Sequence, residues 1–213
     1  MKAPAKIPPA FREEHAEAGS VATLHAQAQA CRRCDLYRNA TQVVFGEGDR
    51  HAPVVLVGEQ PGDREDQAGH PFVGPAGRVL DECLDEAGID RAACYVTNAV
   101  KHFKFERRGK RRLHERPNAG EVQRCAWWLG GELALLKPKM IVALGATALY
   151  ALMGRSVGLM EERGHILKAT DGTSVLVTIH PSYLLRIRDR DDARAQRAAF
   201  VSDLRKIAGV LDE

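Results

Sequence analysis

Residues 58–77 form a long segment rich in glycine, proline and acidic side chains, and no other stretch constrains the fold of this chain as strongly. The segment follows Val54–Val57, a β-branched run that predicts a buried strand, and it ends where apolar side chains take up helical spacing from Val79 onward. Strand, glycine-rich loop and helix in this order are the usual way in which an α/β protein builds a site at the carboxyl end of a strand. We therefore predict that this loop forms the floor of a pocket; the simpler alternative is a solvated acidic turn.

Strand and helix patterns alternate through the rest of the chain. Strands are predicted over 54–57, 95–98, 140–144 and 175–179. Helices are predicted over 76–87, 118–136 and 146–153, with a further helix from Ser20 to about residue 30, a closing helix over 194–211 and a short edge strand over 41–45. This alternation predicts an α/β fold with three layers, α/β/α, in which helices cover both faces of a central four-stranded, mainly parallel sheet.

The length of 213 residues is close to that of one domain and is enough to bury a large core without disulfides. We expect a flexible leader over 1–18, rich in proline, alanine and charge, followed by a single domain over 19–213. No run of eighteen apolar residues occurs, and the first nine residues lack the apolar core of a signal peptide. A soluble, cytoplasmic monomer with no membrane partner is therefore expected.

Polar side chains follow the predicted strands at the point where each strand ends. Glu59 follows the first strand, Asn98 ends the second and His180 follows the fourth. The carboxyl ends of parallel strands lie side by side, so these three side chains are expected to converge on one crevice. The amide of Asn98 suits the paired donor and acceptor of a pyrimidine edge, and Phe72 or Phe103 is suited to stack on the ring. The simpler interpretations are a turn-forming asparagine, a loop histidine and two core phenylalanines.

Five cysteines in a chain without secretory features favour free thiols or a metal centre over a disulfide framework. Cys31 and Cys34 are three positions apart, so their two thiolates are able to bind one metal ion or cluster. Two more ligands are needed, and the candidates are Cys125 together with Cys83, Cys94 or His102. Two of these, Cys83 on an apolar helix face and Cys94 at the start of a strand, fit better as small core residues. Cys125 and His102 remain as the candidates.

A basic segment lies between residues 101 and 116. It holds only two acidic residues, Glu106 and Glu115, and its basic residues are Lys101, Lys104, Arg107, Arg108, Lys110, Arg111, Arg112 and Arg116. Such a local block is able to neutralise phosphates, with an affinity that falls steeply as salt rises, although the net charge of the whole chain is only +3. A solvated basic loop is the alternative that involves no ligand.

Several short motifs together resemble those of the uracil-DNA glycosylase superfamily, and most closely those of its iron–sulfur branch, family 4. They occur in order along the chain and are Gly58–Asp66, Pro71–Gly77, Asn98–Lys101, Leu144–Thr147 and His180–Ser182. The insertion Gly109–His114, together with Lys101–Phe105, resembles the UdgX members of that superfamily, which become covalently joined to uracil-containing DNA. The resemblance runs from about Cys31 to Leu185 and implies the α/β/α fold of that superfamily.

The resemblance implies a [4Fe-4S] cluster held by Cys31, Cys34, His102 and Cys125. His102 stands where the ordinary iron–sulfur glycosylases carry a cysteine, which is a departure from the family pattern. Imidazole and thiolate ligands also suit zinc, so a zinc ion is the alternative cofactor. A brown colour with broad visible absorption would distinguish the cluster from zinc.

The resemblance also implies which residues bind the DNA substrate. Those implied to bind uracil are Gln60, Asp63, Phe72 and Asn98. In this set Phe72 stacks on the extruded base and Asn98 reads its edge, while the other two shape the pocket and its loop. Those implied to bind the flanking phosphates are Lys101, Arg111 and Arg112.

Three further residues are implied to take part in the chemistry. His180 donates a hydrogen bond to the departing uracil anion, in the manner of an oxyanion hole. Glu59 serves the positive charge that develops on the sugar. His114 then captures the deoxyribose at C1′ before water does.

We therefore predict a DNA-repair enzyme that excises uracil from DNA, favours single-stranded DNA and ends as a covalent protein–DNA adduct after one turnover. The main alternative is a conventional family 4 uracil-DNA glycosylase that turns over. A non-catalytic DNA-binding module stabilised by a metal is the alternative from another functional class, and it would retain uracil-containing DNA without releasing the base.

Overall fold

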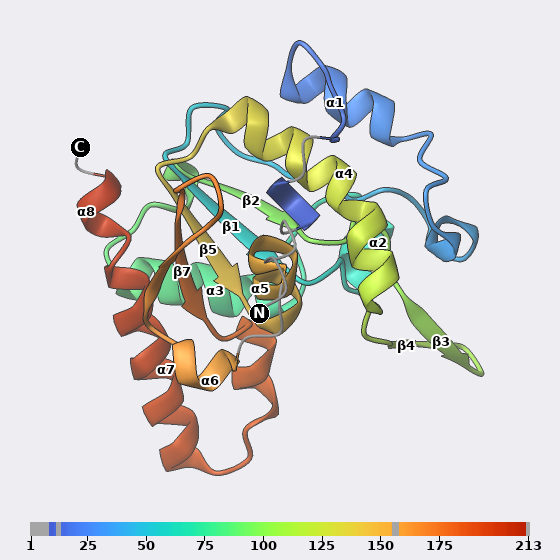
Figure 1. Cartoon of the computed structure of the whole chain (residues 1–213). Helices are drawn as coiled ribbons and strands as arrows, with labels where there is room; N and C mark the ends of the chain where they lie inside the picture. Colours follow the sequence, from blue (N-terminus) through green and yellow to red (C-terminus); the bar gives the residue numbers. More distant parts are fainter. Residues whose placement is uncertain (1–8, 12–13, 155–157, 212–213) are drawn as a thin grey trace, which may run out of the picture.

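The computed structural model describes residues 9–11, 14–154 and 158–211, and its centre is a five-stranded sheet (Figure 1). The strand order is β2-β1-β5-β7-β6. Four strands run parallel, namely β1 (Val54–Gly58), β2 (Cys94–Asn98), β5 (Met140–Leu144) and β7 (Ser174–Thr178). The fifth, β6 (Ile166–Lys168), pairs antiparallel with β7 at the edge. The four predicted strands are confirmed to within one residue at each end, and the predicted four-stranded sheet is corrected to five because the three-residue β6 is too short to show a period.

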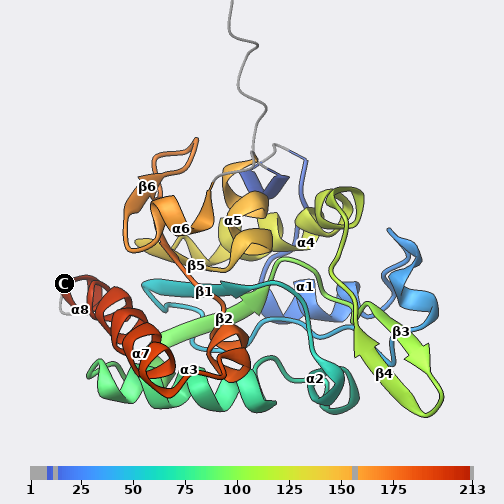
Figure 2. The same cartoon turned by 90° about the horizontal axis from the view of Figure 1, so that it is seen from below.

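Helices cover both faces of this sheet, which confirms the predicted three-layer α/β/α arrangement (Figure 2). Successive strand residues point to opposite faces. Val55 and Val57 of β1 belong to the core under α1 (Val21–Ala28), α4 (Ala119–Leu136) and α5 (Ala146–Met153). Val54 and Leu56 belong to the opposite core, under α3 (Pro75–Glu86) and α7 (Arg190–Arg205). All five β1 residues are buried, as expected for a central parallel strand.

Most predicted helices are confirmed, and two of them begin at a polar side chain that caps the N-terminus. The Ser20 hydroxyl accepts from the Thr23 N–H at the start of α1, and Asn118 caps α4 through the Glu121 N–H. The closing helix differs from its prediction: it begins earlier, after Asp189, and it is divided into α7 and a short α8 (Ala208–Leu211). Asp189 accepts from two backbone N–H groups there, which explains the earlier start.

The basic segment folds into a β-hairpin, which the sequence had suggested only as a loop. Its strands β3 (Phe105–Arg108) and β4 (Arg111–His114) pair antiparallel, and Gly109 turns the chain with a φ of +59°. A short helix, α2 (Asp63–Ala68), lies inside the predicted loop 58–77. The predicted edge strand over 41–45 is wrong: this stretch forms no strand, and Val44 donates its N–H to the Lys101 carbonyl instead.

Part of the predicted leader packs on the domain. Ala10 and Ala16 are buried, and the Ala16 N–H donates to the Trp127 carbonyl of α4 at 3.0 Å. Residues 1–8 and 12–13 lie outside the described residues, so the division into a leader and a domain stays a prediction. Over the described ranges, no helix combines the length and the apolar character needed to cross a membrane.

Candidate active site

A cavity of about 1120 Å³ opens at the carboxyl ends of the parallel strands. The predicted side chains that line it are Glu59, Gln60, Asp63, Phe72, Asn98, His114 and His180. They come from the segment after β1, from the ends of β2 and β4 and from the loop after β7. The expected convergence of Glu59, Asn98 and His180 on one crevice is therefore found, and His114 reaches the same cavity from the hairpin.

The loop after β1 is held in shape by one buried carboxylate. Glu65 accepts from the Gly74 N–H at 2.7 Å and from the Gly62 N–H at 3.1 Å. A Cβ at either glycine would lie 2.6 to 2.7 Å from a Glu65 oxygen, so no larger residue fits without moving this carboxylate. The glycines of this loop thus allow close approach to a buried acid, which supports the predicted pocket floor rather than a solvated turn.

Asn98 and Phe72 are packed against each other through Gly58. Both side chains are buried. A Cβ at Gly58 would lie 2.6 Å from Phe72 Cζ and would clash with Asn98 Oδ1. Phe72 has a φ of +58°, a conformation that costs energy for a bulky residue and that is found mostly at functional sites. Its ring lies 6.1 Å from the His180 ring, centroid to centroid, at an angle of 28°. An aromatic face and a fixed amide therefore line the same end of the cavity.

His180 presents one nitrogen to its own loop and leaves the other available. The Ser182 N–H donates to His180 Nδ1 at 3.2 Å, so Nδ1 acts as an acceptor and the ring proton is assigned to Nε2. Burial lowers the pKa of His180 to about 4, with Glu59 opposing and His114 and Arg186 adding to the shift. At neutral pH the ring is therefore an uncharged donor through Nε2, which suits an anion that develops during a reaction.

Glu59 is the charged centre of the cavity. Its Oε1 lies 3.2 Å from His114 Nε2, and its Oε2 accepts from the Thr147 hydroxyl at 2.5 Å. Burial raises the pKa of Glu59, but the hydrogen bonds from His114 and Thr147 outweigh burial, so its pKa lies below the usual value. Glu59 is therefore ionised at neutral pH and adjacent to a half-exposed imidazole. Thr147 was not predicted as a site residue, although it lies in a motif that the sequence singled out.

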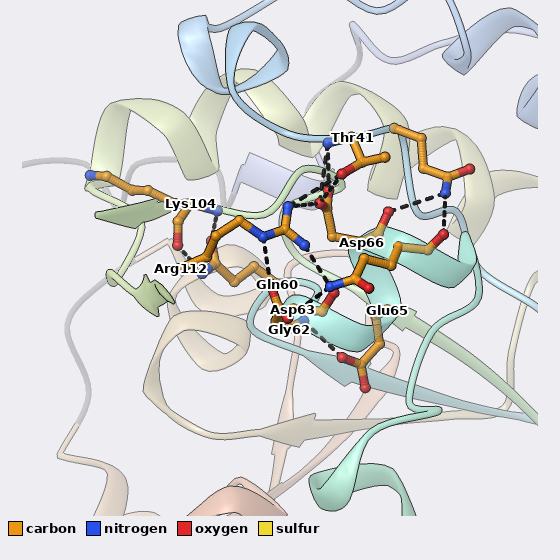
Figure 3. A network of polar contacts seen from close by, with 10 residues as sticks. Thr41, Gln60, Gly62, Asp63, Glu65, Asp66, Lys104 and Arg112 are labelled. Atoms are coloured by element: carbon orange, nitrogen blue, oxygen red, sulfur yellow. Dashed lines mark hydrogen bonds and ion pairs between the residues drawn. The ribbon is translucent and has the colours of Figure 1, made fainter. Parts of the chain in front are cut away.

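Arg112 attaches the hairpin to the loop after β1 (Figure 3). Its guanidinium lies 2.5 Å from Asp63 Oδ1 and 2.5 Å from the fully buried Asp66, and it donates to the Thr41 hydroxyl at 3.2 Å. The same group lies over the rings of Phe103 and Phe105, with its Cζ 5.4 and 5.1 Å from their centroids. The prediction that Arg112 binds DNA phosphate is therefore corrected: its donors are taken by carboxylates of the protein. Phe103, also suggested for stacking on a base, is buried here.

Gln60 makes a second attachment to the same hairpin. Its Nε2 donates to the carbonyls of Lys104 and Glu115, and its Oε1 accepts from the Lys104 N–H, each at 3.1 Å. The amide is thus occupied by backbone groups on both sides of the hairpin. The side chains of Gln60 and Asp63 lie at the cavity, as predicted, but their polar groups hold the hairpin and are not directed to a base.

Lys101 is not on the surface. Its side chain is fully buried, and its Nζ lies 2.5 Å from Glu132, a residue of α4 that is also fully buried. The prediction that Lys101 contacts DNA phosphates is wrong for this reason. Arg111 is exposed, as predicted, and lines a second hollow of about 620 Å³ with Arg107 and Lys110. Glu132 was missed by the sequence reading, although a single acid within the apolar part of a helix is a signal for a buried pair.

The four candidate metal ligands are buried in one region of the protein. Cys31, Cys34, Cys125 and His102 are each at most 7% exposed. Burial raises the pKa of Cys125 to about 12, and the nearby Cys34 and Cys31 sulfurs add to this shift. His102 Nδ1 is buried without a hydrogen-bond partner. Among the described residues, however, no three His, Cys, Asp or Glu side chains form a group that could hold a metal ion, so the predicted cofactor is not confirmed.

Two sulfurs of this set accept hydrogen bonds. The indole N–H of Trp128 donates to Cys31 Sγ at 3.1 Å, and the Lys101 N–H donates to Cys125 Sγ at 3.1 Å. Donors of this kind stabilise negative charge on sulfur, which is what a thiolate ligand carries. These hydrogen bonds and the partnerless His102 nitrogen are features that a thiolate-bound metal centre would use, but the four described side chains are not grouped as ligands of one ion. The other two cysteines, Cys83 and Cys94, are fully buried in the opposite core, as the sequence suggested.

Comparison with known proteins identifies similar chains. The family model described as "Uracil DNA glycosylase superfamily" matches residues 45–205. The chain is 41% identical over 162 residues to the Type-4 uracil-DNA glycosylase of Thermotoga maritima, covering 76% of this chain and 81% of that protein. It is 36% identical over 196 residues to the Type-4 uracil-DNA glycosylase of Pyrobaculum aerophilum, covering 87% and 92%. A similar enzyme of Archaeoglobus fulgidus is 40% identical over 119 residues, 56% of each chain.

Proposed function

The chain belongs to the uracil-DNA glycosylase superfamily, and on that premise we propose that it cleaves uracil from DNA in the cavity at the strand ends. The observation that carries the proposal is the joint lining of this cavity by Phe72, Asn98 and His180. A base inside a duplex is out of reach, so the target is extruded or already single-stranded. Uracil-containing DNA, with single strands favoured, is the proposed substrate of a monomeric protein.

Recognition of uracil follows from the packing of two side chains. The Phe72 ring offers a face on which the base stacks, a contact worth about 1 to 3 kcal/mol. The Asn98 amide pairs with one donor and one acceptor on the base edge. Cytosine presents the opposite pattern at that edge, and it would leave buried polar groups of the site unpaired. The close approach of the Asn98 side chain to Gly58 limits how far this amide can move within the site.

Cleavage breaks the bond between C1′ of the deoxyribose and N1 of uracil, and its electron pair leaves with the base. The developing uracil anion accepts a hydrogen bond from His180 Nε2, a neutral donor that requires no proton transfer, and such a donor is worth on the order of 3 kcal/mol. The sugar develops positive charge at C1′. The ionised Glu59 lowers the energy of this cation because it brings a negative charge into a partly enclosed cavity.

Two fates of the sugar cation remain. Water can attack C1′, which gives an abasic site and a free enzyme that turns over, and the similarity to proteins named as Type-4 uracil-DNA glycosylases favours this outcome. One structural observation favours capture by His114: this imidazole lies at the same cavity, 3.2 Å from Glu59. In that case an unprotonated ring nitrogen bonds to C1′, the proton on the other nitrogen leaves to Glu59 or to solvent, and the protein remains joined to DNA.

Cys31, Cys34, Cys125 and His102 would hold the proposed [4Fe-4S] cluster. The cluster would supply a structural link between the segment 31–34, the segment that follows β2, and α4. The hydrogen bonds to Cys31 and Cys125 and the partnerless His102 Nδ1 support this proposal. Zinc is the alternative, and iron and sulfide analysis together with visible absorption of the purified protein distinguishes the two.

Binding of the flanking DNA is proposed for the hollow beside the hairpin. Arg107, Lys110 and Arg111 line it and are exposed, so they are able to contact phosphates. Binding should weaken as salt rises, because each phosphate contact releases counterions. Lys101 is buried against Glu132 and lies outside this hollow. Arg112 lines it, but its charge is paired with Asp63 and Asp66, so it is not proposed as a phosphate ligand.

The test uses uracil-containing single-stranded DNA with the wild-type protein and a His114→Ala variant. Free uracil is quantified, and the mixture is denatured in hot detergent and separated on a gel. The wild type is expected to release uracil. If it retains the DNA but releases no uracil, the protein is a non-catalytic DNA-binding module. A slower band in the wild type that His114→Ala lacks supports capture. A wild type that releases many uracils per molecule and gives no such band is a conventional glycosylase.

A further inference from the structure

Two fully buried charges, on Lys101 and Glu132, lie behind the cavity and have no assigned role. Lys101 and Glu132 are both 0% exposed, and their charged atoms are 2.5 Å apart. Lys101 Nζ also donates to the Thr97 hydroxyl at 2.6 Å and to the carbonyl oxygen of Asn98 at 2.8 Å. An ammonium group has three N–H donors, so this set uses all of them.

Glu132 is bound from its other side with similar completeness. Its Oε1 accepts from the Gly46 N–H at 3.1 Å, from the Tyr95 phenol at 3.0 Å and from the Thr97 hydroxyl at 3.0 Å. Burial and the neighbouring Glu132 carboxylate both raise the pKa of Tyr95, so its phenol stays protonated as a donor. The pair is thus the centre of a closed polar network inside the apolar layer between the sheet and α4.

A buried ion pair of this kind needs an explanation other than stability. Removing two charges from water costs several kcal/mol for each, and apolar residues of similar volume often give an equal or greater stability. What such a pair does provide is a fixed geometry, because every alternative arrangement leaves a buried charge unpaired. The question is therefore which part of the molecule this pair holds in place.

The pair holds the backbone that leads from the base-reading residue to the candidate metal ligands. One of the three hydrogen bonds that Lys101 Nζ donates fixes the carbonyl of Asn98. The Lys101 N–H donates to Cys125 Sγ at 3.1 Å, and its carbonyl accepts from the Val44 N–H at 2.8 Å. Cys125 and Glu132 are seven residues apart on α4, which is about two turns and brings both to one face of the helix. One helix face therefore fixes both ends of a short segment.

We propose that Lys101 and Glu132 are positioning residues for uracil recognition, which hold the Asn98 backbone so that its amide faces the cavity. This inference rests on the proposed function. Gly58 and Phe72 fix the Asn98 side chain from the cavity side, and the ion pair fixes its peptide from behind. Asn98 is thus held at two points. Release of the rear point would allow its amide to shift, and a displacement of about 1 Å can cost a hundredfold in rate.

The test is a double variant, Lys101→Met with Glu132→Gln, which removes both charges, keeps the side-chain volumes and leaves an oxygen for Gly46 and Tyr95. The matched control is Tyr95→Phe, which removes one hydrogen bond to the same carboxylate but leaves Lys101 bound to the Asn98 carbonyl. Uracil release is measured under single-turnover conditions at saturating protein. The double variant should release uracil about 10- to 100-fold more slowly than the wild type, and Tyr95→Phe should stay within about twofold.

DNA affinity and the iron or zinc content should be the same in all three proteins. The two side chains of the pair are fully buried, and the contact with Cys125 is made by the Lys101 backbone N–H, which the variants keep. A double variant that releases uracil at the wild-type rate overturns the proposal, and so does an equal loss in Tyr95→Phe. If the double variant does not fold, Lys101→Met alone takes its place: it removes the bond to the Asn98 carbonyl, the buried Glu132 can bind a proton and become neutral, and uracil release should change in the same direction.

A second readout requires no activity. The NMR signals of the Asn98 side-chain amide, recorded without DNA, should shift or broaden in the double variant and remain in place in Tyr95→Phe. Unchanged signals would refute the positioning role even if the wild type released no uracil. Conversely, a wild type that is inactive on uracil while its Asn98 signals respond as expected would overturn the proposed function and leave the positioning inference intact.

Discussion

Replacement of Arg112 by Met tests whether the hairpin must be docked for His114 to act. Arg112 is the charged group that joins β4 to Asp63 and Asp66, and its side chain is only 14% exposed. Hydrogen bonds to charged groups contribute about 1.5 to 3 kcal/mol each. We assign the upper part of this range to the hydrogen bond with Asp66, which is fully buried. Asp63 is 46% exposed, so its bond adds little because solvent screens the charges.

The variant is therefore expected to lose about 3 kcal/mol of hairpin docking. Since each 1.4 kcal/mol is a factor of ten, the docked population falls by up to roughly a hundredfold relative to the undocked one. His114 is at the end of β4, so the rate at which it forms an adduct with uracil-containing DNA should fall, by at most this factor, because the rate follows the fraction of docked hairpin. Release of uracil, for which we propose the separate residues Asn98 and His180, should fall less.

The assay compares adduct on a denaturing gel with free uracil over time, at saturating protein so that DNA affinity does not enter. Arg108→Met is the control, because Arg108 belongs to the same hairpin but is 70% exposed and lies 3.5 Å from Glu106 of its own strand. Adduct formation by Arg112→Met at the rate of the control would refute the docking argument. If the wild type forms no adduct, the same variant is read by hydrogen exchange of the β3–β4 amides, which should become faster.

Three further outcomes are expected. Gly58→Ala should lower uracil release by about 100-fold at unchanged DNA affinity, measured by single-turnover kinetics and by fluorescence anisotropy, because its methyl group would clash with Asn98. Burial lowers the pKa of His180 to about 4, so the contribution of its neutral ring to the free energy of unfolding is complete above about pH 6.5 and is lost as the pH falls toward 4. In urea unfolding, the loss of stability between pH 7 and pH 5 should therefore be smaller in His180→Gln than in the wild type, by on the order of 1 to 2 kcal/mol. Trp128→Phe, which removes the indole hydrogen bond to a cysteine sulfur, should speed the loss of visible absorption of the metal-loaded protein in air, whereas Trp127→Phe should not.

The sequence was informative wherever a pattern is local. The four parallel strands follow from short apolar runs, and the helices follow from apolar spacing and from caps such as Ser20. Because parallel strands align their carboxyl ends, the position of Glu59, Asn98 and His180 directly at those ends was enough to predict that they meet. No knowledge of distant contacts was needed for this part of the site.

Residue types alone did not reveal which charged side chains face the solvent. Lys101 and Arg112 belong to one basic segment, yet each is paired with a carboxylate, Glu132 or Asp66, that lies 31 or 46 positions away. The cost of burying a charge is offset only by a partner, and that partner is set by the tertiary fold and not by the local sequence. The sequence by itself thus determined the sheet, the cavity and several residues that line it, and only the tertiary structure decided which cations are paired inside the protein and which remain exposed.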